Sequence, residues 1–112
     1  MALAIDCDLA RFKAEFEKWQ TALGLSDWDC RFKTEDLDGE NARCEYRTAS
    51  RKALLLLDAN HEPFAEPEDC AKHEALELLL ADIGVLLAAF YSEDLVSNET
   101  HKVINRLMAA LK

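Results

Sequence analysis

The spacing of the apolar residues changes along the chain, and this change constrains the fold more than any other feature. Up to residue 23 the large apolar side chains recur every three or four positions, which is the period of an amphipathic helix. They are Leu9, Phe12, Phe16, Trp19 and Leu23. From Trp28 the period becomes two, as in a half-buried strand. Gly24, between the two patterns, is suited to ending a helix. A helix from about Ile5 to Leu23 and then a strand are predicted.

Two more strands are expected before the helical period returns. Alternation resumes over residues 42–47, after the turn signal Asp38-Gly39, so we expect the first two strands to form a hairpin. The run from Ala53 to Leu57 is apolar on both faces and short. This pattern favours a third strand that is more buried than the first two.

The remainder of the chain has a helical pattern. Residues 60–67 contain two prolines and form a predicted loop, and the acidic residues that follow favour a helix start near Pro67. We expect this long helix to extend to about Tyr91 and a closing helix to run from about Ser97 to Leu111. The long helix has an apolar stripe predicted to be buried: Leu76, Leu79, Leu80, Ile83, Leu86, Leu87 and Phe90. The expected fold class is α+β.

Length and charge limit the kind of protein. A chain of 112 residues is enough for one hydrophobic core, so we expect a single domain over residues 1–112. The 13 basic and 22 acidic residues give a net charge of −9, which argues against nucleic acid as a partner. No apolar run approaches the ~18 residues that a membrane-spanning helix needs, and residues 1–8 lack the features of a signal peptide. A cytoplasmic protein without a membrane partner is expected.

The four cysteines are spaced too widely for a C-x-x-C metal or redox motif. Reduced core thiols are the favoured interpretation. A disulfide between Cys30 and Cys44, on adjacent strands, is the alternative.

The most specific chemical feature is a His-Glu-x-x-Glu sequence near the start of the predicted long helix. Residues four apart share a helix face, so His73 and Glu77 can bind one ion, with Glu74 about 100° away around the helix. This is the spacing of the H-E-x-x-H motif of zinc proteases. There the two histidines bind zinc and the glutamate is the general base that deprotonates the metal-bound water. Here Glu77 offers a carboxylate oxygen in the second ligand position.

The closing helix offers a third ligand, either Glu99 or His101. We favour His101, which with His73 and Glu77 gives a zinc site of two histidines and one carboxylate. Gly84 lies on the same stripe of the predicted long helix as His73 and Glu77. We expect another segment to approach the helix closely there.

The alternative interpretation of the motif is a solvated helix shoulder. The chain is rich in glutamate, and a second His-Glu pair, His61-Glu62, has no ligand spacing behind it.

Together, these segments resemble the small zinc-metallopeptidase-like proteins of phages and prophages, a minimal gluzincin type of zincin. The likeness covers most of the chain and rests on residues 25–28 after a Trp-containing helix, 53–57, 71–79 and 99–107. It implies a zincin-like fold, zinc as the cofactor, and an edge strand, here Ala53 to Leu57, that pairs with a peptide or protein substrate by β-augmentation. The family has histidine where this chain has Glu77.

The sequence thus predicts a metallopeptidase-like hydrolase in which metal-activated water cleaves a peptide bond, with Glu74 as catalytic base. The first alternative is a catalytically inactive zincin-like interaction module, motivated by Glu77. The second is an acidic inhibitor that mimics nucleic acid. Its carboxylates would come from the first helix and the first turn, where they are scattered: Asp6, Asp8, Glu15, Glu17, Asp36, Asp38 and Glu40.

Overall fold

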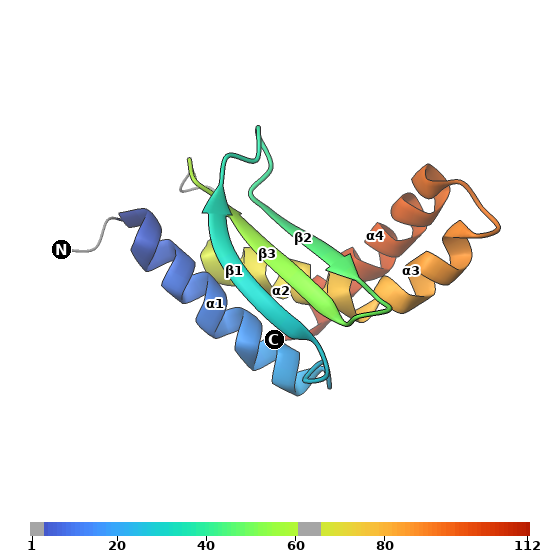
Figure 1. Cartoon of the computed structure of the whole chain (residues 1–112), viewed down its shortest axis with the longest axis horizontal. Coiled ribbons are helices and arrows are strands. Elements are labelled where there is room, and N and C mark those ends of the chain that lie inside the picture. Colours follow the sequence, from blue (N-terminus) through green and yellow to red (C-terminus); the bar gives the residue numbers. More distant parts are fainter. Residues whose placement is uncertain (1–3, 61–65) are drawn as a thin grey trace.

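One helix, three strands and three further helices follow one another along the chain. The computed structural model describes residues 4–60 and 66–112. The elements are α1 (Ala4–Ala22), β1 (Asp29–Glu35), β2 (Ala42–Arg47), β3 (Lys52–Asp58), α2 (Pro67–Leu79), α3 (Ala81–Ala88) and α4 (Glu93–Ala110) (Figure 1). The predicted α+β class is confirmed, and Gly24 follows α1 with a φ of +72°, as expected for a residue that ends a helix. In the described ranges, no helix combines the length and apolarity needed to span a bilayer.

The strand order of the sheet is β1-β3-β2, with β3 parallel to β1 and antiparallel to β2. The predicted hairpin between the first two strands is therefore wrong. Residues 36–41 carry the chain across the sheet, and β3 then inserts between β1 and β2. The prediction that Ala53 to Leu57 is the substrate-binding edge is also wrong, because this strand has a neighbour on each side. Its predicted burial is confirmed, and β1 and β2 form the edges.

Both faces of β3 are covered. On one face Leu55 and Leu57 pack with α1 and α2 in the main core, which also contains Phe12, Phe16, Trp19, Trp28, Ala71, Ala75 and Leu78. On the other face Leu56 is fully buried. The β1–β2 connection is held on that side, because the backbone N–H of Leu37 donates to Oδ1 of Asp58 at 3.1 Å. Leu37 is 1% exposed, so this connection has a small core of its own.

The cysteines are free thiols, but the favoured prediction of core thiols is wrong for Cys7, which is exposed; Cys70 is buried, and Cys30 and Cys44 are half-buried. Cys30 lies on β1 and Cys44 on β2, with β3 between them. Strands separated by a third strand are about 9–10 Å apart, which exceeds the ~7 Å limit between Cα atoms in a disulfide. The expectation that these two cysteines lie on adjacent strands is wrong.

The predicted helix from Pro67 to Tyr91 is two helices. Leu80 separates α2 from α3 with φ −92° and ψ 2°, outside the range of a regular α-helix. The closing helix begins at Glu93, earlier than predicted, and its N-cap is Ser92, whose Oγ accepts the backbone N–H of Leu95 at 3.2 Å.

The predicted buried stripe is correct at Leu76, only half-buried at Leu79 and Leu80, and wrong on α3. Leu76 is fully buried, whereas Ile83, Leu86 and Phe90 are 54%, 64% and 77% exposed. The physical reason is that α3 and α4 extend to one side of the sheet, so the sheet does not lie beneath α3 (Figure 1). The close approach expected at Gly84 is also wrong, since a Cβ there would meet no described atom within 4 Å.

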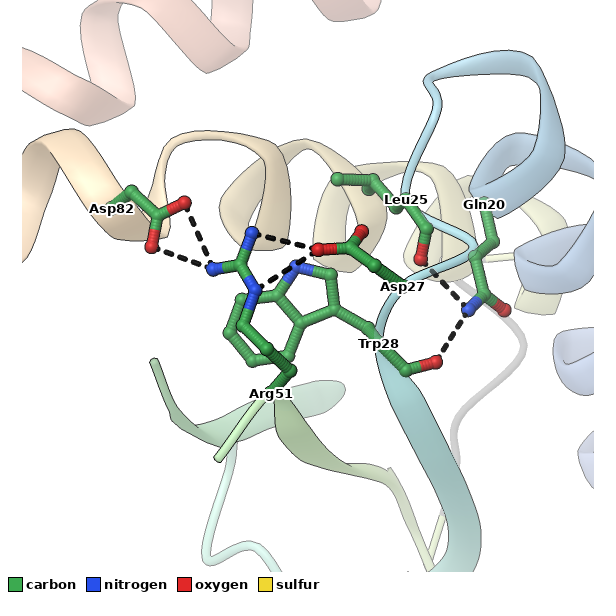
Figure 2. A network of polar contacts seen from close by, with 6 residues as sticks. All are labelled: Gln20, Leu25, Asp27, Trp28, Arg51 and Asp82. Carbon is green, nitrogen blue, oxygen red and sulfur yellow. Dashed lines mark hydrogen bonds and ion pairs between the residues drawn. The ribbon is translucent and has the colours of Figure 1, made fainter. Parts of the chain in front are cut away.

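Arg51, in the turn between β2 and β3, fixes the base of α3. Its Nη1 atom donates to both carboxylate oxygens of Asp82 at 2.7 and 2.9 Å, and its Nε donates to Asp27 at 3.0 Å (Figure 2). The guanidinium lies over the Trp28 ring, 4.4 Å from its centre. Beside it, Gln20 donates to the carbonyl oxygens of Leu25 and Trp28. These contacts join the β2–β3 turn to the α1–β1 connection and to α3.

The strand order makes a prediction about Leu37. In a simple β1–β2 hairpin this residue would lie in a solvated turn, whereas here it is buried over the sheet. We expect Leu37→Ala to lower the free energy of unfolding by about 2–4 kcal/mol, as for other buried leucines. Urea unfolding measures this effect. The control Leu95→Ala removes the same atoms from a site that is 48% exposed and should cost about 1 kcal/mol or less. Equal costs would contradict the described strand order.

Candidate metal centre

Helix α2 positions three of the four predicted site residues. Its inward face packs on the sheet through Ala71, Ala75 and Leu78. His73 and Glu77, one turn apart, lie at the border of this core, with side chains that are 31% and 26% exposed. Glu74 lies on the inward side and is buried, with only 4% exposed.

Helix α4 brings His101 to the same place. Its Nε2 atom lies 3.0 Å from Oε1 of Glu77, and Nε2 of His73 lies 3.8 Å from the same oxygen. The two imidazole rings are 5.7 Å apart between centroids. One ligand atom from each of the three residues lies within 4.8 Å of the other two. The three predicted ligands therefore converge, although they come from two helices.

Two of the three separations are close to those around a small divalent ion, and the third, between the two imidazoles, is bounded only by the 4.8 Å limit. Two ligand atoms that each lie about 2.0–2.1 Å from a tetrahedral zinc ion are about 3.3 Å apart. The distances of 3.0 and 3.8 Å from Oε1 of Glu77 to the two imidazole nitrogens fall on either side of this value. Two imidazoles and one carboxylate are a donor set found in catalytic zinc sites.

The nature of the contact between His101 and Glu77 depends on which ring nitrogen of His101 carries the proton. Nδ1 lies 2.8 Å from the carbonyl oxygen of Ser97, which only accepts, so Nδ1 carries a proton. In a neutral imidazole, Nε2 then has a lone pair, directed at a carboxylate oxygen 3.0 Å away. Two lone pairs at this distance repel, so the contact requires either a proton or a metal ion. A histidine that ligates a metal commonly donates its other N–H to a backbone carbonyl in this way.

Glu74 occupies an unusual environment beside the three ligands. Burial, followed by a hydrogen bond with Glu77 and the charges of Glu77 and Glu40, raises the pKa of Glu74 far above its ordinary value. Its Oε1 atom has no hydrogen-bond partner among the described residues. Burying a carboxyl oxygen without a hydrogen-bond partner costs free energy unless another group binds to that oxygen.

Two clefts are lined in part by residues of the candidate centre. The first, of about 390 Å³, lies between β2, α3 and α4; it includes Glu77, His101, Cys44 and Tyr46 in its lining. The second, of about 400 Å³, lies between the β1–β2 connection and α2; it includes His73 and Glu74. Each cleft reaches a different part of the candidate centre.

Lys72, next to His73, fixes the far end of α4. Its Nζ atom donates to the carbonyl oxygen of Met108 at 2.8 Å and also to that of Leu111. A lysine at a helix C-terminus satisfies carbonyl groups that have no partner within the helix. Lys72 and the His101–Glu77 contact therefore hold α4 on α2 at two points.

Sequence analysis missed two residues that support the centre. Ser97 lies four positions before His101, so the helical period could have indicated that its carbonyl is within reach of the ring. Lys72 carries no comparable signal, because its partners lie 36 and 39 residues away. Of the two proposed third ligands, Glu99 faces elsewhere and pairs with Lys102 at 2.8 Å. The other His-Glu pair, His61-Glu62, lies outside the described residues.

No protein-family model matches the chain, and neither a curated protein nor a solved structure matches it significantly. The likeness to gluzincins therefore stays a prediction from the sequence.

The buried carboxyl group of Glu74 predicts how stability depends on pH. Because the pKa of Glu74 is higher in the folded state than in the unfolded state, its contribution to stability is complete below the unfolded pKa. It is lost as the pH rises toward the folded pKa, at up to about 1.4 kcal/mol per pH unit.

Glu74→Gln should remove this dependence and make the metal-free protein more stable at pH 8, by roughly 1–3 kcal/mol. Chemical denaturation at pH 5 and pH 8 in the presence of a chelator measures the difference. Glu99→Gln is the matched control and should leave the dependence unchanged. A Glu74→Gln variant that is less stable than the wild type at pH 8 would contradict the inferred burial of a neutral acid.

Proposed function

We propose that the chain is a zinc-binding protein of the metallopeptidase type, with His73, Glu77 and His101 as the ligands. The observation that carries this proposal is the convergence of three ligand atoms, from two helices, within 4.8 Å of one another. The hydrogen bond from His101 Nδ1 to the Ser97 carbonyl oxygen supports it, because it leaves Nε2, which lies beside Glu77, free to hold an ion.

The departure from the H-E-x-x-H pattern is compensated within the site. Glu77 replaces the second histidine of the motif and adds a negative charge. His101, from α4, supplies the second imidazole, so the complete set is two imidazoles and one carboxylate. This set has the charge and donor types of zinc sites that catalyse hydrolysis. Glu77 is therefore compatible with a functional centre.

Hydrolysis of a peptide bond is the reaction that these residues support best. A zinc ion, when bound, lowers the pKa of a coordinated water and polarises a carbonyl group. Glu74 is the residue that would accept a proton, because it follows the proposed ligand His73 and lines the same cleft. A nearby cation favours the ionised form of this carboxyl group.

The peptide or protein substrate would enter beside β2. This strand is an edge of the sheet, and its residues Cys44 and Tyr46 line the same cleft as Glu77 and His101. An edge strand offers free backbone groups for pairing with an extended peptide. β2 therefore takes the role that the sequence had assigned to β3. A cytoplasmic location, without nucleic acid or a membrane as partner, is part of this proposal.

A catalytically inactive interaction module is the second candidate. The burial of Glu74 favours it, because a neutral carboxyl group is a poor proton acceptor. In this case zinc, held by the same ligands, would only fasten α4 to α2.

Zinc binding is predicted to depend on Glu77 and not on Glu99. The wild type, purified without a chelator or a histidine tag, should bind about one zinc per chain in an isothermal titration. Glu77→Gln removes a direct ligand, so we expect a loss of affinity above the roughly 10–100-fold that is typical for a residue that only orients a ligand. Glu99→Gln makes the same chemical change on α4, at a residue that pairs with Lys102 and is not a proposed ligand. This variant should bind zinc like the wild type. An equal loss in both variants would place the ion elsewhere.

Catalysis is predicted to depend on Glu74 while zinc binding does not. We expect the zinc-loaded wild type to cleave members of a fluorogenic peptide library, and Glu74→Gln to lower kcat/KM by about 100-fold or more. Zinc content, measured by elemental analysis, should be unchanged. Stoichiometric zinc without any hydrolysis in the wild type would instead support the interaction module.

A further inference from the structure

The outer face of α3 is an exposed apolar surface. We define the α3 surface as Ile83 and Leu86 of α3 with Phe90 and Tyr91 of the turn that follows it, which are 54%, 64%, 77% and 57% exposed. The N–H groups of Phe90 and Tyr91 still bond to the Leu87 carbonyl oxygen, so at about 100° per residue the first three residues lie within about a 60° arc. Gly84, Val85 and Ala88 lie on the opposite side and line the cleft shared with α4. The α3 surface therefore faces away from α4.

Little of α3 is buried by the rest of the molecule. Among its residues, only Ala81 is buried. The helix extends beside α4, away from the sheet (Figure 1). A contiguous group of large apolar side chains in water is unfavourable, and on a monomer such a group commonly marks a binding site. A second protein surface would remove these side chains from water.

The spacing of the α3 surface indicates the shape of its partner. Ile83, Leu86 and Phe90 follow one another at intervals of three and four residues. This is the interval with which one helix packs its side chains between those of another. A helix laid along α3 would contact all three, as in other cases where an amphipathic helix binds an apolar helical surface.

The net charge of the segment that carries the surface indicates the partner's composition. Residues 73–101 contain six carboxylates and neither lysine nor arginine. Four of these carboxylates belong to α3 and α4: Asp82, Glu93, Asp94 and Glu99. Asp82 is paired with Arg51 and Glu99 with Lys102, while the exposed Glu93 and Asp94, on the first turn of α4, give the α3–α4 hairpin a net negative charge; Glu93 also lines the cleft between the two helices. A second copy of the chain would bring like charges together, whereas a basic partner would be attracted.

We propose that the α3 surface docks an amphipathic helix of another protein, with an apolar stripe and flanking lysine or arginine residues. The inference does not rest on the zinc site, because the α3 surface faces away from the cleft that Glu77 and His101 line. Apolar contact would supply most of the binding energy, and the carboxylates would select a basic partner over an acidic one.

The test uses a synthetic helical peptide with leucine at the a and d positions of three heptads and lysine at most other positions. Fluorescence anisotropy should show saturable binding to the wild type. Leu86→Glu should weaken binding by about 10-fold or more, which corresponds to the loss of one well-packed apolar contact.

The matched control is Ala14→Glu, which adds the same charge at an exposed position of α1. Because one more negative charge attracts a basic peptide, weaker binding of Leu86→Glu alone identifies an apolar contact at α3. Circular dichroism of both variants confirms that each is folded. The same peptide with glutamate in place of lysine should bind at least about 10-fold more weakly than the lysine peptide.

Three results would overturn the proposal. The first is no binding of the lysine peptide, or equal affinity for the Leu86→Glu and Ala14→Glu variants. The second is equal binding of the lysine and glutamate peptides. The third is a wild-type dimer in sedimentation velocity that Leu86→Glu dissociates, since the α3 surface would then belong to a second copy of the chain.

Discussion

The central position of β3 determines where the other elements lie. Its leucines project from both faces, so each face needs cover: α1 and α2 on one, and the connection that carries Leu37 on the other. This requirement fixes α2 with Ala75 and Leu78 toward the sheet. The helical period then places His73 and Glu77 at the edge of the core and Glu74 inside it. The geometry of the candidate centre thus follows from the burial of one strand.

The contact between α2 and α4 adds the third ligand. Lys72 holds the C-terminal end of α4, and the pairing of Glu77 with His101 holds its middle. The contact between Glu77 and His101 needs a proton or a metal ion between its two atoms, whereas the contact of Lys72 does not. Arg51 fixes the base of α3 independently. The candidate centre and the α3 surface therefore share a scaffold but face different directions.

Local patterns predicted the order of helical and strand segments and the three candidate ligands that converge, because period, caps and ligand spacing are properties of neighbouring residues. Strand order was not predicted correctly. Asp38-Gly39 is a normal hairpin signal, and only the burial of Leu56 on the second face requires β3 at the centre. The apolar stripe on α3 was correctly identified as a stripe. Whether such a stripe is covered depends on distant elements, and the break at Leu80 has no proline or glycine to indicate it.

The most direct measurement is crystal diffraction from zinc-incubated protein, recorded on both sides of the zinc absorption edge. The proposed centre predicts one anomalous peak about 2.0–2.2 Å from a nitrogen of His73, a nitrogen of His101 and an oxygen of Glu77. It also predicts that Nδ1 of His101 remains bonded to the carbonyl oxygen of Ser97. A peak at other residues, or a crystal with zinc in solution and none between α2 and α4, would contradict it.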